Sequence, residues 1–264
     1  MAIRIPKRIF GVDVNDKTLE EALKDSSSEP QEPVQKPRGL ILPGNFDGNQ
    51  YVQIPNTTLV IAKAETHKGK NWNDTHNALG GEGLFMPTPA IFLKYFASLK
   101  DSASGKTNLY DGRGQLITAV EAQDLWKYAS SGHRGGCWTW LDAYFEKDSQ
   151  EKMWVKTDHR ASNGRNGGLT NRRISLDVPV DEEGFVKLKF TSLGMPKEKS
   201  EANGYQAGKN IYFYPPTNES VARFGALSDW ADLSCGGDPS DGGVGLGVFA
   251  CAEGTPTKKS GGSK

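Results

Sequence analysis

The chain has 264 residues, a mass of 28.7 kDa, and 32 basic against 32 acidic side chains, so its formal net charge is zero. This balance, without a basic stripe interleaved with aromatic residues, argues against nucleic acid and anionic membranes as partners. Six tryptophans and 9% aromatic residues predict a packed globule, and 31 glycines predict many turns.

Export signals and disulfides are not evident in the sequence. The N-terminal residues lack the apolar core of a signal peptide, and no run of about 18 apolar residues occurs. We therefore expect no membrane insertion. The localisation stays open, and cell-surface display by an unrecognised route is one alternative. Three cysteines do not make a disulfide framework in a chain of this size, and pairing of Cys235 with Cys251 stays open.

Composition divides the chain into four segments. Residues 1–25 form a short N-terminal segment with a helix expected over 18–25. Residues 26–39 are rich in Pro, Ser and Glu and have too little apolar surface to offset their ordering entropy, which predicts a linker or mobile loop. The globular domain is expected over 40–251. Residues 252–264 are polar and glycine-rich, and we expect a disordered tail.

Three helices are predicted in the first half of the domain. The first covers 71–79 and ends at two glycines. The second starts at Thr88, an N-cap residue followed by proline, and places apolar side chains on one face at helical spacing. The third starts at Thr118, with Glu121 in the spacing of a capping box.

Strands are predicted mainly after these helices. Short runs rich in aromatic and β-branched residues, separated by turn residues, occur at 51–55, 58–64, 137–145, 152–158, 184–190, 210–216 and 220–224. Helices followed by strands, without regular alternation, predict an α+β fold with helices packed on a twisted antiparallel sheet and long irregular loops.

Several short motifs match known ligand-binding motifs only in part. The "SGKT" at 104–107 has Lys100 where a phosphate-binding loop needs glycine, and "GGVGLG" at 242–247 precedes a strand, not a helix. The "WND" at 72–74 matches a tripeptide of calcium-binding lectins, but it lies early in the domain at a helix start. The four histidines lack metal-ligand spacing, and no nucleophile elbow occurs. The sequence predicts no metal, no cofactor and no catalytic residue.

The segment from 221 to 251 is unusual in composition. It holds seven glycines, four aspartates and three serines but no Lys, Glu, Gln, Met or Asn. Such a segment normally indicates a flexible loop. Here it lies between strand-like runs at 220–224 and 246–252.

Two blocks resemble a known family. "WTWLDA" at 138–143 is followed by S-V-A-R-F, S-D-x-A-x-L-x-C-x-x-x-P and L-G-V between 220 and 248. This order resembles the variable proteins of diversity-generating retroelements, nearest to the group from uncultivated archaea such as Nanoarchaeota. The upstream helices are similar to those of the same group, so the resemblance covers about 40–251. The final segment "VFACAE" at 248–253 differs from the basic final segment typical of the family.

The resemblance implies a C-type-lectin-like domain that displays hypervariable side chains to a ligand and is not an enzyme. The ligand is unknown, with a protein or glycan on another cell or virus as the expected class and a monomer favoured. Buried Val221, Phe224, Leu233, Leu246 and Val248 would hold the fold, and Pro239 would fix the loop. The implied ligand-binding positions are Gly225, Leu227, Trp230, Asp232, Ser234, Gly236, Gly237, Asp238, Ser240, Asp241, Gly242, Gly243, Val244 and Gly245.

The composition agrees with the copying mechanism of these retroelements, in which template adenines are miscopied. Asparagine codons whose adenines become guanine encode Gly, Asp or Ser, and they cannot encode Lys, Glu, Gln or Met. Trp230 needs a different parent codon, or its position is fixed. The small residues predict a shallow site with an acidic rim, in which Trp230 is the main aromatic contact.

Two other functions remain open. One is an enzyme similar to formylglycine-generating enzymes, which would need two cysteines close together in an accessible cleft. The other is an adhesin or structural module in which the glycine-rich segment is only a flexible loop.

Overall fold

The computed structural model describes residues 8–9, 12–13, 39–42, 46–133, 135–161 and 169–257, which fall into two compact units, Met1–Lys36 and Pro37–Lys264. In the first unit, β1 (Arg8–Ile9) pairs antiparallel with β2 (Val12–Asp13). The helix expected over 18–25 and all but the last residue of the linker expected over 26–39 lie outside the described residues. The second unit contains the fold described below.

Three α-helices lie within the described residues, and all three match the sequence-based predictions. They are α2 (Trp72–Gly81), α3 (Pro89–Ala103) and α4 (Ala119–Ser131). Thr88 Oγ1 accepts a hydrogen bond from the Ile91 N–H, and Thr118 Oγ1 accepts one from the Glu121 N–H, as expected of N-caps. None of these helices combines the length and apolar character needed to cross a membrane.

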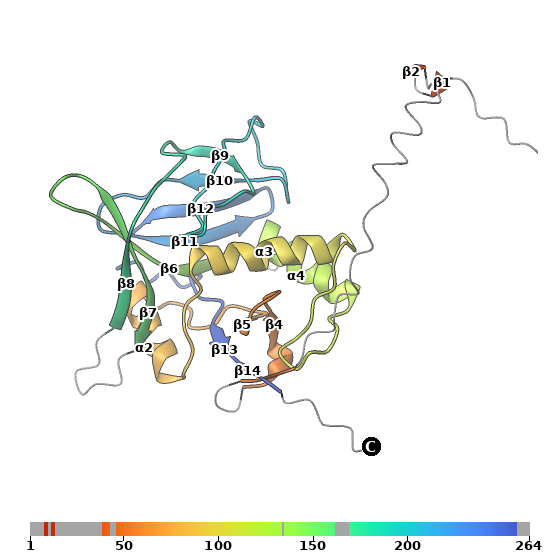
Figure 1. Ribbon diagram of the computed structural model, residues 1–264, viewed down its shortest axis with the longest axis horizontal. Helices are drawn as coiled ribbons and strands as arrows, with labels where there is room; N and C mark the ends of the chain where they lie inside the picture. The colour runs from red at the N-terminus through yellow and green to blue at the C-terminus, as the bar shows by residue number, and fades with distance from the viewer. Residues whose placement is uncertain are drawn as a thin grey trace, which may run out of the picture. The chain divides into compact units, whose positions relative to one another are not determined.

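A seven-stranded sheet forms the centre of the domain, in the order β8-β7-β6-β11-β12-β10-β9. Its pairs are antiparallel except β10 with β12, which is parallel. Figure 1 shows β9, β10, β12 and β11 in this order above α3. The strands are β6 (Cys137–Lys147), β7 (Met153–Ala161), β8 (Leu169–Ser175), β9 (Gly184–Lys187), β10 (Asn210–Tyr214), β11 (Ser220–Leu227) and β12 (Trp230–Gly237).

Smaller sheets close the domain below α3 (Figure 1). A three-stranded sheet has the order β13-β5-β4, with β4 (Tyr51–Gln53), β5 (Leu59–Ala62) and β13 (Cys251–Glu253). β3 (Leu40–Ile41) pairs antiparallel with β14 (Thr255–Pro256). A short 3-10 helix, η1 (Gly48–Gln50), precedes β4. These pairs bring the two ends of the domain together.

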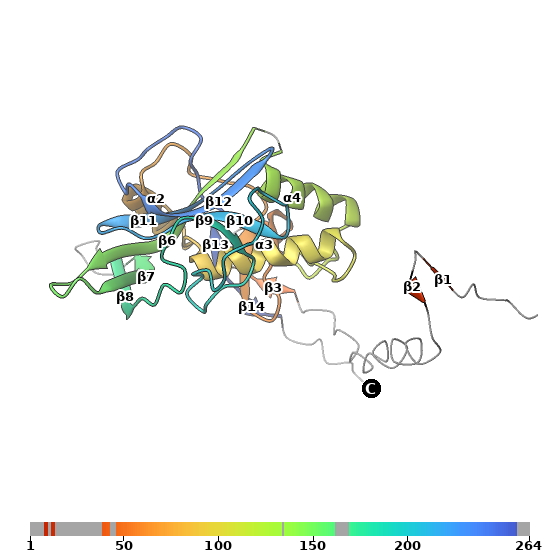
Figure 2. The ribbon, with the colours of Figure 1, turned by 90° about the horizontal axis from the view of Figure 1, so that it is seen from above.

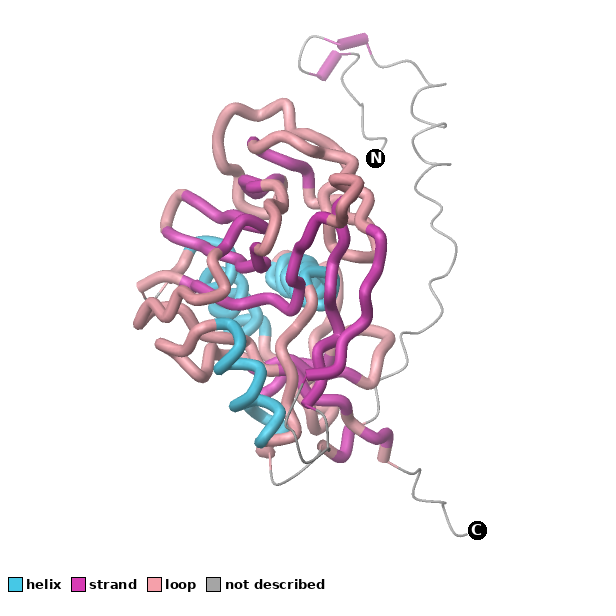
Figure 3. The backbone as a smooth tube through the Cα atoms, turned by 90° about the vertical axis from the view of Figure 1, so that its left-hand side faces the viewer, coloured by secondary structure: helices cyan, strands magenta, loops and turns pink. Residues whose placement is uncertain are grey.

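One face of the large sheet carries the main core. α3 and α4 pack against each other and contact β6, β11 and β12. The ring of Phe224 lies 4.8 Å from that of Phe92 and 5.4 Å from that of Phe96, centroid to centroid. Viewed from above, α3 and α4 lie at one end of the sheet and α2 at the other (Figure 2). Long loops connect the elements (Figure 3).

The mixed α+β architecture is confirmed, but three details differ from expectation. β8 and β12 are strands that the sequence analysis did not predict. The ordered domain continues past residue 251, because Cys251–Glu253 and Thr255–Pro256 form strands where a disordered tail was expected. Residues 258–264 lie outside the described residues.

Gly132 fixes the end of α4 against β11, and its replacement tests that contact. It has φ 58°, and a Cβ there would lie 2.2 Å from the carbonyl oxygen of Ala226. We expect Gly132→Ala to lower the free energy of unfolding by about 2–5 kcal/mol, from left-handed strain and overpacking.

Gly105→Ala is the matched control for this prediction. Gly105 has φ 74°, but a Cβ added there would have no heavy atom of another segment within 4 Å. Only the left-handed strain of about 1–2 kcal/mol should appear. Equal losses in the free energy of unfolding of the two variants, measured by urea denaturation, would contradict the proposed contact.

Candidate functional site

A groove of about 770 Å³ lies across the face of the sheet that points away from the core. The alternation of side chains between the two faces of β12 creates this groove. Trp230, Asp232 and Ser234 line the groove, whereas Ala231 and Leu233 belong to the buried cluster under the helices. The groove is therefore built on strands whose other face is held by the core.

Aromatic rings form one wall of the groove and its support. The Trp230 ring lies 4.8 Å from Tyr212 and 5.7 Å from Phe185, centroid to centroid. Tyr214, which lines the groove, lies 4.9 Å from Tyr212. Trp230 Nε1 donates a hydrogen bond of 2.8 Å to Asp232 Oδ2. Trp230 is thus held in one orientation by β9, β10 and its own strand.

The charges in the groove are mostly negative. Asp181, Glu183 and Asp232 line it, and Arg223 is the one cation among its lining residues. Arg223 Nη1 lies 3.3 Å from Asp241 Oδ2, so part of its charge is already paired. Burial raises the pKa of Asp232, although the hydrogen bond from Trp230 and the charge of Arg223 act in the opposite direction. The groove therefore offers apolar ring faces beside hydrogen-bond acceptors.

Five of the positions implied by the resemblance lie together in this groove: Leu227, Trp230, Asp232, Ser234 and Gly236. Leu227 is exposed and Asp232 and Ser234 are largely buried in the groove walls. The five anchor positions expected to hold the fold are all buried, as predicted: Val221, Phe224, Leu233, Leu246 and Val248.

Gly225 and Gly237 do not face the groove as freely as the resemblance implied. Both are buried, and a Cβ on Gly225 would lie 2.5 Å from the Trp138 ring. A Cβ on Gly237 would lie 2.9 Å from the carbonyl oxygen of Val221. These glycines allow close contacts within the sheet, so a larger side chain at either position would have to displace neighbouring atoms.

The remaining implied positions lie in the loop between β12 and β13: Asp238, Ser240, Asp241, Gly242, Gly243, Val244 and Gly245. This loop has internal order. Asp238 Oδ1 accepts hydrogen bonds from the Ser240 N–H and Oγ, and Asp241 Oδ1 accepts one from the Gly243 N–H. The Trp72 N–H donates to the Pro239 carbonyl at 3.1 Å, which ties the loop to α2. Asp241 also connects it to the groove through Arg223.

Part of the groove was not predicted from the sequence. Trp138 is half-buried and lines the groove, whereas Trp140 on the same strand is fully buried. Strand alternation places both on one face, but it does not tell which part of that face other segments cover. Arg223 was predicted only as a fixed motif residue, and Tyr214 only as part of a strand.

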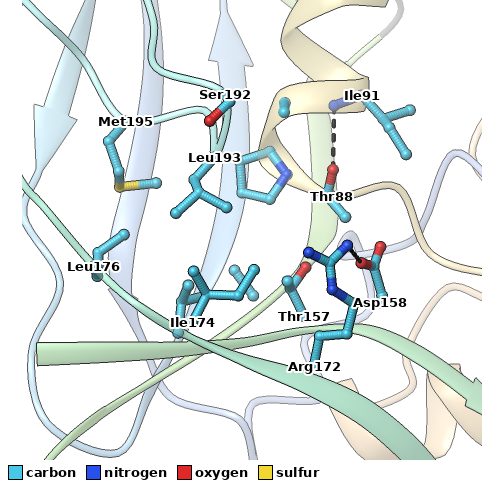
Figure 4. A pocket seen from close by; sticks show the side chains of 14 residues that line it. Thr88, Ile91, Thr157, Asp158, Arg172, Ile174, Leu176, Ser192, Leu193 and Met195 are labelled. Atoms are coloured by element: carbon cyan, nitrogen blue, oxygen red, sulfur yellow. Dashed lines mark hydrogen bonds and ion pairs between the residues drawn. The ribbon is translucent and has the colours of Figure 1, made fainter.

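A second cavity, of about 350 Å³, lies at the start of α3 (Figure 4). Ile174, Leu176 and Met195 give it an apolar lining. Its charged groups are already paired, because Arg172 Nη1 lies 2.9 Å from Asp158 Oδ2. Its described lining is mainly apolar, so it has weaker features of a specific site than the groove.

The cysteines do not form an accessible pair in the described part of the chain. Cys137, Cys235 and Cys251 are free thiols and all are buried. Burial raises the pKa of each thiol, which disfavours the reactive thiolate.

Comparisons with known proteins add no relative: family models, curated proteins and solved structures each gave no significant match to the chain.

Adjacent glycines on β12 test the groove directly. Gly236 is exposed, and the nearest heavy atom to a Cβ added there would lie 3.8 Å away, whereas the same distance is 2.9 Å at Gly237. We expect Gly236→Asn to change the free energy of unfolding by less than about 0.5 kcal/mol. Gly237→Asn should cost about 1–3 kcal/mol through overpacking.

Chemical denaturation of the two variants measures this difference. Both substitutions add the same side chain to the same strand, one residue apart, so each is the control for the other. A large loss at Gly236, or none at Gly237, would show that the two faces of β12 are assigned incorrectly.

Proposed function

We propose that the protein is a receptor-type ligand-binding protein, not an enzyme, and that it displays replaceable side chains on a C-type-lectin-like scaffold. In this proposal, adenine-directed copying from a template repeat diversifies the positions that line the groove. The ligand is a variable one, of the kind presented by a protein or glycan on another cell or virus, and the binding unit is a monomer.

The proposal rests on the alternation of groove-lining and buried residues along β12. The positions that the codon argument marks as products of adenine miscopying include Asp232, Ser234 and Gly236, and these line one groove. Leu233 and Cys235, which lie between them, are fully buried. A segment diversified on alternate residues would change the groove and leave the core intact.

The groove also has the physical character of a recognition surface. Trp230 offers a rigid aromatic contact, and aromatic residues dominate the energetics of many interfaces. Its indole is positioned by Tyr212, Phe185 and Asp232 before any ligand arrives. Preorganisation of this kind lowers the entropic cost of binding.

The alternatives have less support. A cysteine-dependent enzyme needs an accessible pair of thiols, and the three cysteines are buried. A merely flexible glycine-rich loop does not account for the hydrogen-bonded strand β12, which pairs with both β10 and β11.

A library that randomises groove positions 227, 230, 232, 234 and 236 tests the proposal at the level of the protein. Because these side chains do not hold the core, we expect most variants to unfold within about 4 °C of the parent in thermal scans. Selection against an arbitrary protein target should yield specific binders.

The matched control randomises 231, 233 and 235 on the same strand, which should abolish cooperative unfolding in most variants. Loss of folding in both libraries, or failure to select any binder from a folded groove library, would contradict the proposed display.

The coding DNA provides an independent test of the diversification mechanism. We expect a near-copy of the sequence encoding residues 221–251 close to the gene, differing at template adenines, together with a reverse transcriptase gene. Sequencing of the flanking region that finds neither would remove the mechanism, while leaving the ligand-binding groove to be judged by the libraries.

A further inference from the structure

Three buried side chains from separate elements meet beside α2. His76 lies on α2, Asp142 on β6 and His159 on β7, and their ligand atoms all lie within 4.8 Å of one another. Asp142 Oδ1 lies 2.5 Å from His159 Nδ1 and 3.6 Å from His76 Nε2. No local metal-ligand spacing marks these residues in the sequence, because the fold brings them together from separate elements.

The cluster contains an unsatisfied group. His76 Nε2 is buried and has no hydrogen-bond partner, and its side chain is only 2% exposed. Its distance to Asp142 Oδ1 is too long for a hydrogen bond. A buried polar atom without a partner is costly and uncommon, and an absent ion is one of its standard explanations.

The other atoms of the cluster are held in place by hydrogen bonds. Asp142 Oδ2 accepts a hydrogen bond of 2.9 Å from the His159 N–H, which leaves Oδ1 directed at the two imidazoles. The Trp72 ring contacts the imidazoles of His76 and His159, with centroids 4.2 and 5.0 Å away. Trp72 is itself fixed by a 3.0 Å hydrogen bond from Nε1 to the Leu141 carbonyl. Supporting contacts of this kind orient metal ligands in proteins.

We propose that His76 Nε2, Asp142 Oδ1 and His159 Nδ1 bind one divalent first-row transition-metal ion, of which Zn²⁺ is the reference case. Two nitrogen ligands and one carboxylate oxygen match the preferences of such ions and not those of Ca²⁺ or Mg²⁺. Ligands about 2.1 Å from a tetrahedral ion lie about 3.4 Å from each other. The 3.6 Å spacing of His76 and Asp142 already suits this geometry. The His159–Asp142 contact would open by about 1 Å to admit the ion.

The positive charge of Arg160 would repel a bound metal ion, but the exposure of its side chain limits this repulsion. Its side chain follows His159 on β7, and its guanidinium lies 3.8 Å from the centroid of the Phe85 ring. Arg160 is exposed, so solvent screens its charge. Arg160→Gln removes the remaining repulsion and should strengthen zinc binding slightly, whereas a purely structural hydrogen-bond network would show no change in zinc binding.

The ion would act as a structural cross-link. α2 is a short helix whose packing onto the large sheet runs through β7, and the three ligands join α2 to β6 and β7. Bound metal stabilises only the folded state, so zinc should raise the unfolding temperature.

Zinc titration of the full chain tests the site. The purified protein is stripped with a chelator and dialysed, ZnCl₂ is added, and metal content is measured by inductively coupled plasma mass spectrometry alongside calorimetric scans. We expect one zinc per chain and a higher unfolding temperature. His76→Gln should weaken zinc binding at least tenfold and remove the thermal shift. The exposed His133→Gln is the matched control and should bind like the parent.

Several results would overturn the site. These are no stoichiometric zinc in the parent protein, unchanged zinc binding in His76→Gln, or equal loss in His133→Gln. Should His76→Gln fail to fold, X-ray absorption spectroscopy of the zinc-loaded parent decides the question. Scattering from two imidazoles with oxygen ligands supports the site, and sulfur ligands contradict it.

Discussion

The packing of Phe224 against Phe92 and Phe96 determines which face of the large sheet is free. Phe224 lies near the middle of β11, so this contact seats α3 over one face of the central strands. Every second residue of β11 and β12 then lies in the core. Arg223 and Leu227 of β11 and alternate residues of β12 line the groove on the opposite face, so the site depends on where one helix packs.

This arrangement separates core-forming residues from groove-lining residues on the same strand. Fully buried Leu233 and Cys235 contribute to the core, where losing apolar contacts is costly. Ser234, between them, touches the groove and can change with little effect on the core. The separation is not complete, because Gly225 and Gly237 permit close contacts that a larger side chain would prevent. The proposed diversification of this surface would be limited by backbone spacing as well as by the core.

Local signals in the sequence were sufficient for the helices and for most strands. Thr88 and Thr118 mark helix starts through N-cap chemistry, which depends only on neighbouring residues. β12 was missed because its small residues have weak strand propensity, and its pairing with β10 and β11 comes from tertiary contacts. The resemblance implied Trp230 and Asp232 as ligand-binding positions, and both line the groove. The contribution of Trp138 was not predicted, since alternation cannot tell which part of a face is covered.

The loop between β12 and β13 depends on the same region as the buried cluster. Its Pro239 carbonyl accepts a hydrogen bond from the Trp72 N–H, at the first residue of α2. The Trp72 ring also contacts the imidazoles of His76 and His159, so the loop and the buried cluster share one supporting residue. Hydrogen bonds to the Asp238 and Asp241 side chains order the loop from within, while α2 at Pro239 and Arg223 at the groove hold it from outside. Replacing either aspartate would remove a contact that defines the path of the loop, and this limits how far its composition can vary.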